Sequence, residues 1–236
     1  MIQMVTRKPT GVSGFDELIQ GGLPATSLTL LAGAPGTAKT TFSSQFLYYG
    51  ATDHKEPGVY VSFSEDRASY LLAMRQFGMD FENLEKKKMF KFLDMLTPRG
   101  SIVRETTNII LKEVESLKAK RLVVDSFNAL SIGLRDPASA RIFLHFVLVK
   151  IMRALGTTTI LISEIPAGEL KTGMAGEAFL ADGLVILHYF PKTLDPSSVR
   201  AVEIRKMRMT KHTERMVPFE IGPNGIKIQP QAELIL

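Results

Sequence analysis

Cysteine is absent from this chain of 236 residues. Its absence excludes disulfide bonds, thiolate zinc sites and cysteine nucleophiles, and it fits the reducing environment of a cytosol. No apolar run approaches the roughly 18 residues that a membrane-spanning helix needs. The first residues, MIQMVTRKPTG, lack the apolar core of a signal peptide. We therefore expect a soluble, cytoplasmic protein that makes no membrane contact.

Internal repeats, low-complexity tracts and linkers are also missing. The composition is that of an ordinary globular protein, with 45% hydrophobic and 22% charged residues. A chain of this length suits one α/β domain and is short for two. We expect residues 1–236 to form a single domain.

Short apolar runs alternate with helical patterns along the chain. The runs are typical of buried parallel strands and lie at 27–32, 58–63, 121–124, 157–162 and 183–190. A helical pattern at 138–156 ends at Gly156, which suits a C-cap. Beyond residue 183 the pattern changes to strands joined by turns. The sequence predicts an α/β fold with a mostly parallel central sheet flanked by helices, and antiparallel hairpin strands at its C-terminal edge.

Residues 33–41 read GAPGTAKTT and lie between an apolar strand and the start of a helix. They nearly match the phosphate-binding pattern G-x-x-x-x-G-K-[ST]. In such a loop, backbone N–H groups and a helix N-terminus cradle phosphates, the lysine reaches the β- and γ-oxygens, and the hydroxyl binds Mg²⁺. We expect ATP or ADP with Mg²⁺ to contact Gly33, Ala34, Pro35, Gly36, Thr37, Ala38, Lys39, Thr40 and Thr41.

The sixth position of that pattern holds Ala38 instead of glycine. Only a positive φ angle demands glycine, so one methyl group is tolerable if Ala38 is already helical. Gly33 and Gly36 remain for the tight part of the turn. We expect nucleotide binding to survive the substitution.

Asp125 ends the apolar stretch RLVVDS. A nucleotide site of this kind needs an acidic residue beside the magnesium, at the end of a neighbouring strand. The alternative is an ordinary strand-end aspartate that starts a turn or caps a helix. Because a phosphate loop lies upstream, we expect Thr40 and Asp125 to hold Mg²⁺ together.

The net charge of +5 is concentrated in one segment. Residues 199–215 contain six basic and two acidic residues, and six minus two gives +4. Two interpretations stay open. The segment is either a solvated edge strand or a surface that faces phosphate, on ATP or on nucleic acid.

Several segments together resemble the KaiC-like group of RecA-superfamily ATPases. They are TGVSGFDELIQGGLP at 10–24, VYVSFSED at 59–66, LVVDS at 122–126, and EIRKMRMTKH with PFEIGPNGI near the end. The similarity covers about residues 8–230, and the archaeal RadA-paralog proteins have the same single-domain plan. The resemblance implies a RecA-like P-loop NTPase core. It also implies a homo-oligomeric ring, often a hexamer, with ATP between subunits.

The resemblance implies roles for individual residues as well. Lys206 and Arg208 match the Lys-x-Arg pair that reaches the γ-phosphate of a neighbouring subunit, which would account for the basic strand. Strand alternation puts both side chains on one face. An arginine acting in trans can accelerate phosphoryl transfer by about 10³–10⁵. Lys39, Lys206 and Arg208 are therefore predicted catalytic residues.

The water-activating position departs from the family pattern. KaiC-type sequences place Phe-Glu-Glu after the second core strand, whereas this chain has Phe63, Ser64 and Glu65. Glu65 is our candidate general base; the alternative is an acidic residue that complements a helix dipole. Ser64 implies slow hydrolysis. We do not expect self-phosphorylation, because Ala178 and Phe179 occupy the acceptor positions and lack hydroxyls.

DNA binding is not decided by the sequence. In RecA-like proteins two loops bind single strands, and their counterparts here, at 127–140 and 164–177, carry no excess of positive charge. Two classes of function stay open. One is a slowly hydrolysing ATPase ring, and the other is a nucleotide-gated module that binds single-stranded DNA or a protein with negligible turnover. A degenerate fold without nucleotide is a third option, disfavoured by the intact Lys39, Thr40 and Asp125.

Overall fold

The computed structural model describes residues 5–95, 102–128, 154–165, 177–191 and 199–234. The helices are η1 (Asp16–Ile19, 3₁₀), α1 (Lys39–Asp53), α2 (Arg67–Arg75), α3 (Phe81–Lys86), α4 (Ile102–Ser116) and α8 (Glu177–Leu180). The strands are β1 (Arg7–Lys8), β2 (Leu23–Pro24), β3 (Leu28–Gly33), β4 (Gly58–Ser62), β5 (Phe90–Asp94), β6 (Arg121–Asp125), β7 (Thr158–Glu164), β8 (Gly183–Phe190), β9 (Val199–Met207), β10 (Val217–Gly222) and β11 (Gly225–Ile228).

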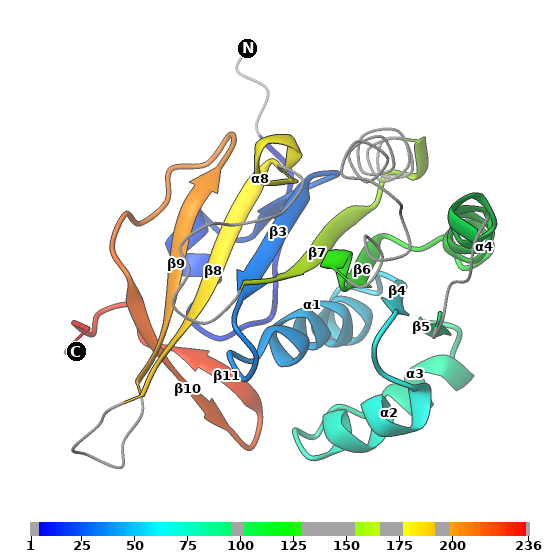
Figure 1. The fold of residues 1–236 in the computed structure, drawn as a ribbon, viewed down its shortest axis with the longest axis horizontal. Coiled ribbons are helices and arrows are strands. Elements are labelled where there is room, and N and C mark those ends of the chain that lie inside the picture. The colour runs from blue at the N-terminus through cyan, green and yellow to red at the C-terminus, as the bar shows by residue number, and fades with distance from the viewer. Residues whose placement is uncertain (1–4, 96–101, 129–153, 166–176, 192–198, 235–236) are drawn as a thin grey trace.

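Among the described residues, nine strands form one sheet in the order β11-β10-β9-β8-β3-β7-β6-β4-β5 (Figure 1). From β8 to β5 every neighbouring pair is parallel. From β8 to β11 every pair is antiparallel. This arrangement confirms the predicted fold class, a mostly parallel sheet with antiparallel strands at the C-terminal edge.

Strand alternation divides the buried side chains between two hydrophobic cores. Leu31 of β3 and Tyr60 of β4 face a core that includes side chains of α1, α2 and α3. Their neighbours Leu30 and Val59 face a second core, which includes side chains of α4. Both faces of the sheet are thus covered by helices, as a parallel sheet requires.

The predicted strands and helices differ from the observed ones in a few places. The strand predicted at 183–190 coincides with β8, whereas β5 was not predicted at all. In β5 the exposed Lys91 and Asp94 interrupt the buried residues, and this strand lies at the sheet edge. The helix predicted at 138–156 lies almost entirely outside the described residues. Its predicted cap, Gly156, has a left-handed φ of 64°.

The turn between β3 and α1 needs glycine at two positions for different reasons. A Cβ atom on Gly33 would lie 2.6 Å from the carbonyl oxygen of Leu187 and from Thr37 Oγ1. Gly36 has a φ of +79°, a conformation that glycine adopts without strain. Both requirements agree with the predicted tight part of the loop.

Ala38 does not meet the condition of being already helical. Its φ is 71° and its ψ is 29°, in the left-handed region, and α1 begins only at Lys39. The chain turns out of the loop at this residue, before the first helical residue. Alanine therefore occupies the conformation that glycine provides in the usual pattern, and its Cβ costs about 1–2 kcal/mol there.

Replacing Ala38 by glycine should therefore stabilise the protein. For Ala38→Gly we expect the free energy of unfolding to rise by about 1 kcal/mol, because the relief of left-handed strain exceeds the added freedom of the unfolded chain. Equilibrium urea denaturation measures the change. The matched control is Ala73→Gly in α2, where glycine should lower the stability by about 1 kcal/mol. A loss of stability in Ala38→Gly would contradict the strain argument.

Candidate functional site

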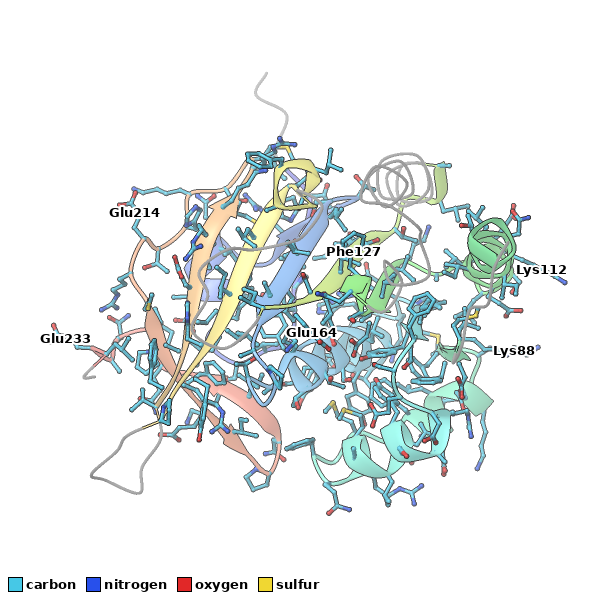
Figure 2. All side chains as sticks on the ribbon, viewed as in Figure 1. Lys88, Lys112, Phe127, Glu164, Glu214 and Glu233 are labelled. Atoms are coloured by element: carbon cyan, nitrogen blue, oxygen red, sulfur yellow. The ribbon has the colours of Figure 1, made fainter. Side chains whose placement is uncertain are left out.

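Parallel pairing brings the carboxyl ends of β3, β7, β6 and β4 to one edge of the sheet. Gly33 at the end of β3 pairs with Glu164 of β7, and Ser62 of β4 pairs with Asp125 of β6. Figure 2 shows Glu164 at this edge, beside the helix that follows the loop. Residues that are far apart in the sequence therefore meet around loop 33–41, where open α/β sheets bind their ligands.

Lys39 lies within the loop itself. Its Nζ donates hydrogen bonds to the carbonyl oxygens of Gly33 and Ala34, both at 2.9 Å. Burial lowers the pKa of Lys39, and the carboxylates of Glu164 and Asp125 partly oppose that effect. The ammonium group is thus held over the loop by backbone carbonyls, at the place where the pattern puts a phosphate-binding lysine.

The rest of the loop follows the predicted strand–loop–helix arrangement. Pro35 and Gly36 are exposed at the tip, while Thr37 and Thr41 are buried. The Thr37 hydroxyl donates to the carbonyl oxygen of Ala34 at 2.8 Å, which closes the turn. Thr40 and Thr41 are neighbours at the start of α1. Only the half-buried Thr40 has a described hydrogen bond from its hydroxyl to Asp125 at the end of β6.

Asp125 lies opposite Thr40, as predicted. The Thr40 hydroxyl donates to Asp125 Oδ2 at 3.4 Å, and the Tyr60 hydroxyl donates to the same oxygen at 2.5 Å. Burial raises the pKa of Asp125, whereas the hydrogen bond from Tyr60 and the charge of Lys39 lower it. The sequence analysis missed Tyr60. The only signal was a phenol in the middle of an otherwise aliphatic strand, two residues before its end.

Glu65 lies in the turn that follows β4. The Ser62 hydroxyl fixes that turn, since it accepts from the backbone N–H of Glu65 at 2.9 Å and donates to its carbonyl oxygen at 2.6 Å. Burial raises the pKa of Glu65, and the nearby carboxylates of Asp125 and Asp66 raise it further. Asp66 is the N-cap of α2, because its side chain accepts from the backbone N–H of Ser69. The acidic residue that caps the start of α2 is therefore Asp66 and not Glu65.

Glu164 is a site residue that the sequence analysis did not single out. The prediction counted it only as one negative charge in loop 164–177, yet it is the last residue of β7 and pairs with Gly33. Its charge acts on both Lys39 and Asp125. Asn128 orients its backbone, accepting from the N–H of Glu164 at 2.7 Å. The signal that could have found Glu164 is its position two residues after the apolar run 157–162.

Lys206 and Arg208 lie near the amino ends of the parallel strands, on the side of the sheet opposite to loop 33–41. Met207, between them, pairs with Gly183, which in turn pairs with Thr29 near the amino end of β3. Lys206 Nζ donates to the carbonyl oxygens of Ala178 and Ala181, at 3.2 and 2.6 Å. The two cations are therefore close to each other, as alternation predicted, but apart from the loop of their own chain.

Arg208 is held by a single carboxylate in the described structure. Its Nη1 donates to Asp182 Oδ1 at 3.1 Å, and its side chain is 54% exposed. Asp182 Oδ2 accepts from the backbone N–H of Leu28 at 3.1 Å, so the aspartate joins Arg208 to the start of β3. Phe179, on the neighbouring α8, is 81% exposed.

The oxygen ligands at the loop suit Mg²⁺. A hydroxyl and a carboxylate stand within hydrogen-bonding distance at the start of α1, and Mg²⁺ is usually held by one or two carboxylates together with substrate phosphates and water. Among the described residues, no group of three or more His, Cys, Asp or Glu side chains could hold a metal ion. A Mg²⁺ ion held there would take phosphate oxygens and water as its further ligands.

Two other predictions concern partners. Loops 127–140 and 164–177, the expected counterparts of the DNA-binding loops, lie largely outside the described residues. Within the part of the chain that the structure describes, none of the helices has the length and hydrophobicity to cross a bilayer.

Comparison with known proteins identifies full-length relatives. The UPF0273 protein PH0284 of Pyrococcus horikoshii is 34% identical over 98% of this chain and 97% of its own length. The circadian clock oscillator protein KaiC of Prochlorococcus marinus is 32% identical over 96% of this chain, which corresponds to 46% of KaiC. The crystal structure of the KaiC-like protein PH0186 of Pyrococcus horikoshii superposes with a TM-score of 0.86 at 39% identity, covering 96% of this chain and 100% of that one.

A family model described as "ATPase: KaiC" matches residues 8–233. That range includes the loop, Asp125, Glu65 and the Lys206–Arg208 segment. The match confirms the resemblance that the sequence motifs indicated. This chain belongs to the KaiC family of ATP-binding ATPases in the RecA superfamily.

Proposed function

We propose that residues 1–236 form one domain that binds Mg²⁺-ATP in loop 33–41 and hydrolyses it slowly at the subunit interfaces of a homo-oligomeric ring. The observation that carries this proposal is the meeting of Lys39, Thr40 and Asp125 at the end of β3. A ring of six is the expectation from the family resemblance. Self-phosphorylation is not part of the proposal, because Ala178 and Phe179 have no hydroxyl to accept a phosphoryl group.

Thr40 and Asp125 are the residues that would hold Mg²⁺. When bound, the ion neutralises charge on the β- and γ-phosphates. The ammonium group of Lys39 would also neutralise phosphate charge. On nucleotide binding it would donate its hydrogen bonds to phosphate oxygens in place of the carbonyl oxygens of Gly33 and Ala34. The backbone N–H groups of the loop and the start of α1 complete the phosphate site.

Glu65 is the proposed general base for the attacking water. Its raised pKa makes the carboxylate a stronger base than an exposed glutamate, and the turn held by Ser62 fixes its backbone. Ser64 is exposed and supplies no carboxylate. This chain therefore has one glutamate, Glu65, where the family pattern Phe-Glu-Glu has two. The missing carboxylate supports slow turnover.

Lys206 and Arg208 support hydrolysis from a neighbouring subunit in this proposal. They lie near the amino end of β3, and the loop begins at its carboxyl end, Gly33. Five residue steps of about 3.3 Å separate these ends, roughly 16 Å. An intersubunit contact therefore explains how both cations and the loop could act on one γ-phosphate. Arg208 would exchange Asp182 for phosphate.

A nucleotide-gated module for single-stranded DNA or a protein is the second candidate, and Ser64 is the observation that favours it. Negligible turnover with tight ATP binding would support this alternative. Titration with single-stranded DNA at about 50 mM salt, with and without ATP, tests its DNA version, because contacts with phosphate are strongest at low salt.

Lys39→Ala should abolish nucleotide binding. We expect at least a 100-fold rise in the Kd for ATP, about 2.7 kcal/mol, because the loop loses its charged phosphate contact. Equilibrium binding of a fluorescent ATP analogue measures the Kd. Lys86→Ala, at an exposed lysine of α3, is the matched control and should bind like wild type. Unchanged binding and turnover in Lys39→Ala would remove the proposed nucleotide site.

Glu65→Gln should keep ATP binding and lose turnover by about 10²–10⁴. A base works only when deprotonated, so its raised pKa moves the fall of kcat on the acid side to a higher pH than an ordinary carboxylate would give. Steady-state turnover between about pH 4 and 8 measures this fall of kcat at acid pH. The fall should disappear in Glu65→Gln. Ser64→Ala is the control and should retain wild-type turnover; full activity in Glu65→Gln would exclude this base.

Arg208→Ala should lose turnover and keep ATP binding, and it should be rescued in mixed rings. Each interface needs an intact loop from one subunit and an intact arginine from the next. An equimolar mixture of Arg208→Ala and Lys39→Ala should recover roughly one quarter of wild-type turnover, since about one interface in four combines both intact halves. Arg205→Ala, on the same strand, serves as the control. An inactive mixture that still assembles would exclude an intersubunit site.

A further inference from the structure

Tyr60 is a buried phenol that points at the proposed magnesium site. It lies in the middle of β4, 1% exposed, and pairs with Val123, two residues before Asp125. Because alternate residues of a strand face the same side, Tyr60 and Asp125 project into the same core. The Tyr60 hydroxyl lies 2.5 Å from Asp125 Oδ2, a short hydrogen bond of the kind that a hydroxyl makes with a carboxylate.

The ring of Tyr60 is held in place by its aromatic neighbours. Phe92 of β5 stacks on it with 5.5 Å between ring centroids and 6° between planes. Tyr70 of α2 contacts it at 4.6 Å and 45°. A side chain packed in this way has one rotamer available, so the position of its hydroxyl is fixed by the core and not by solvent.

The hydroxyl of Tyr60 also constrains Thr40. The Thr40 hydroxyl donates to Asp125 Oδ2, and it interacts with the Tyr60 oxygen as well. In the part of the chain that the structure describes, both hydrogen bonds to the Asp125 side chain end on Oδ2, and Oδ1 carries none. One carboxylate oxygen is therefore engaged by the protein, and the other can coordinate a metal ion or accept a hydrogen bond from a water bound to it.

We propose that Tyr60 is a positioning residue for magnesium: its hydroxyl fixes the Asp125 carboxylate in the orientation that supports Mg²⁺ beside Thr40. This inference rests on the proposed function, because it assigns Asp125 to the ion. Partners that orient a metal-binding carboxylate typically contribute 10–100-fold to metal affinity. Tyr60→Phe would keep the packing but leave the longer hydrogen bond from Thr40 as the one remaining side-chain hydrogen bond to Asp125 among the described residues.

A purely structural role for Tyr60 makes a different prediction. A buried tyrosine hydroxyl needs a partner, so removing it could change stability alone. Tyr70 provides the matched comparison, because it is also fully buried in the same aromatic cluster and its hydroxyl bonds to Ser44 Oγ at 2.8 Å, not to Asp125. Tyr60→Phe and Tyr70→Phe thus remove the same atom from neighbouring positions.

The experiment is a Mg²⁺ titration of nucleotide binding on the full chain. A fluorescent ATP analogue is bound at increasing Mg²⁺ and, separately, in EDTA. For Tyr60→Phe we expect the Mg²⁺ concentration at half-maximal binding to rise about tenfold, with binding in EDTA within about twofold of wild type. Tyr70→Phe should match wild type in both conditions. An unshifted titration in Tyr60→Phe, or an equal shift in Tyr70→Phe, would overturn the inference.

A double-mutant cycle keeps the test decisive if Tyr60→Phe also loses stability. If Tyr60 acts through Asp125, adding Tyr60→Phe to Asp125→Asn should change the Mg²⁺ titration by less than about twofold, because the carboxylate is already absent. Additive effects of the two substitutions would overturn the inference. If nucleotide binding by the wild type does not depend on Mg²⁺, the proposed function is excluded. If it depends on Mg²⁺ but the titration of Tyr60→Phe is not shifted, only the proposed role of Tyr60 is excluded.

Discussion

The parallel hydrogen-bond ladder from β3 through β7 and β6 to β4 is the constraint on which the site depends. Because these strands run in the same direction, their carboxyl ends form one edge, and the register places Gly33 beside Glu164 and Ser62 beside Asp125. Any slip of one residue in a ladder would turn Asp125 to the other face of the sheet. The positions of loop 33–41, of Asp125 at the end of β6 and of the turn with Glu65 thus follow from strand pairing, and burial strengthens the interactions between their charged groups.

Lys39 and Asp125 partly cancel the effect of burial on each other's pKa. Burial raises the pKa of Asp125 and lowers that of Lys39, while each of the two groups opposes the shift of the other. Tyr60 contributes a donor without adding charge. A neutral donor can orient a carboxylate without competing with a cation for it, which an arginine or lysine in the same place would do.

The sequence was sufficient to predict the fold class and the meeting of Lys39, Thr40 and Asp125, because glycine, lysine and strand-end acids carry local signals. The left-handed backbone of Ala38 at the entry into α1 could not be predicted, since an alanine side chain carries no signal for that conformation. Tyr60 and Glu164 were not predicted as site residues, because their sequence signals are weak and their roles arise from pairing between strands more than 60 residues apart in the chain. Contacts of that kind leave no periodic trace in one sequence.

The separation of Arg208 from loop 33–41 along β3 has a consequence for how many sites an assembly contains. In the proposed arrangement each chain carries the phosphate-binding half of one site and the arginine half of another. A closed ring of n chains then has n complete sites, an open row has n minus one, and a single chain has none. When an open row closes into a ring, the new interface adds the last complete site. The number of active sites per chain therefore depends on whether the assembly is closed, and not only on the protein concentration.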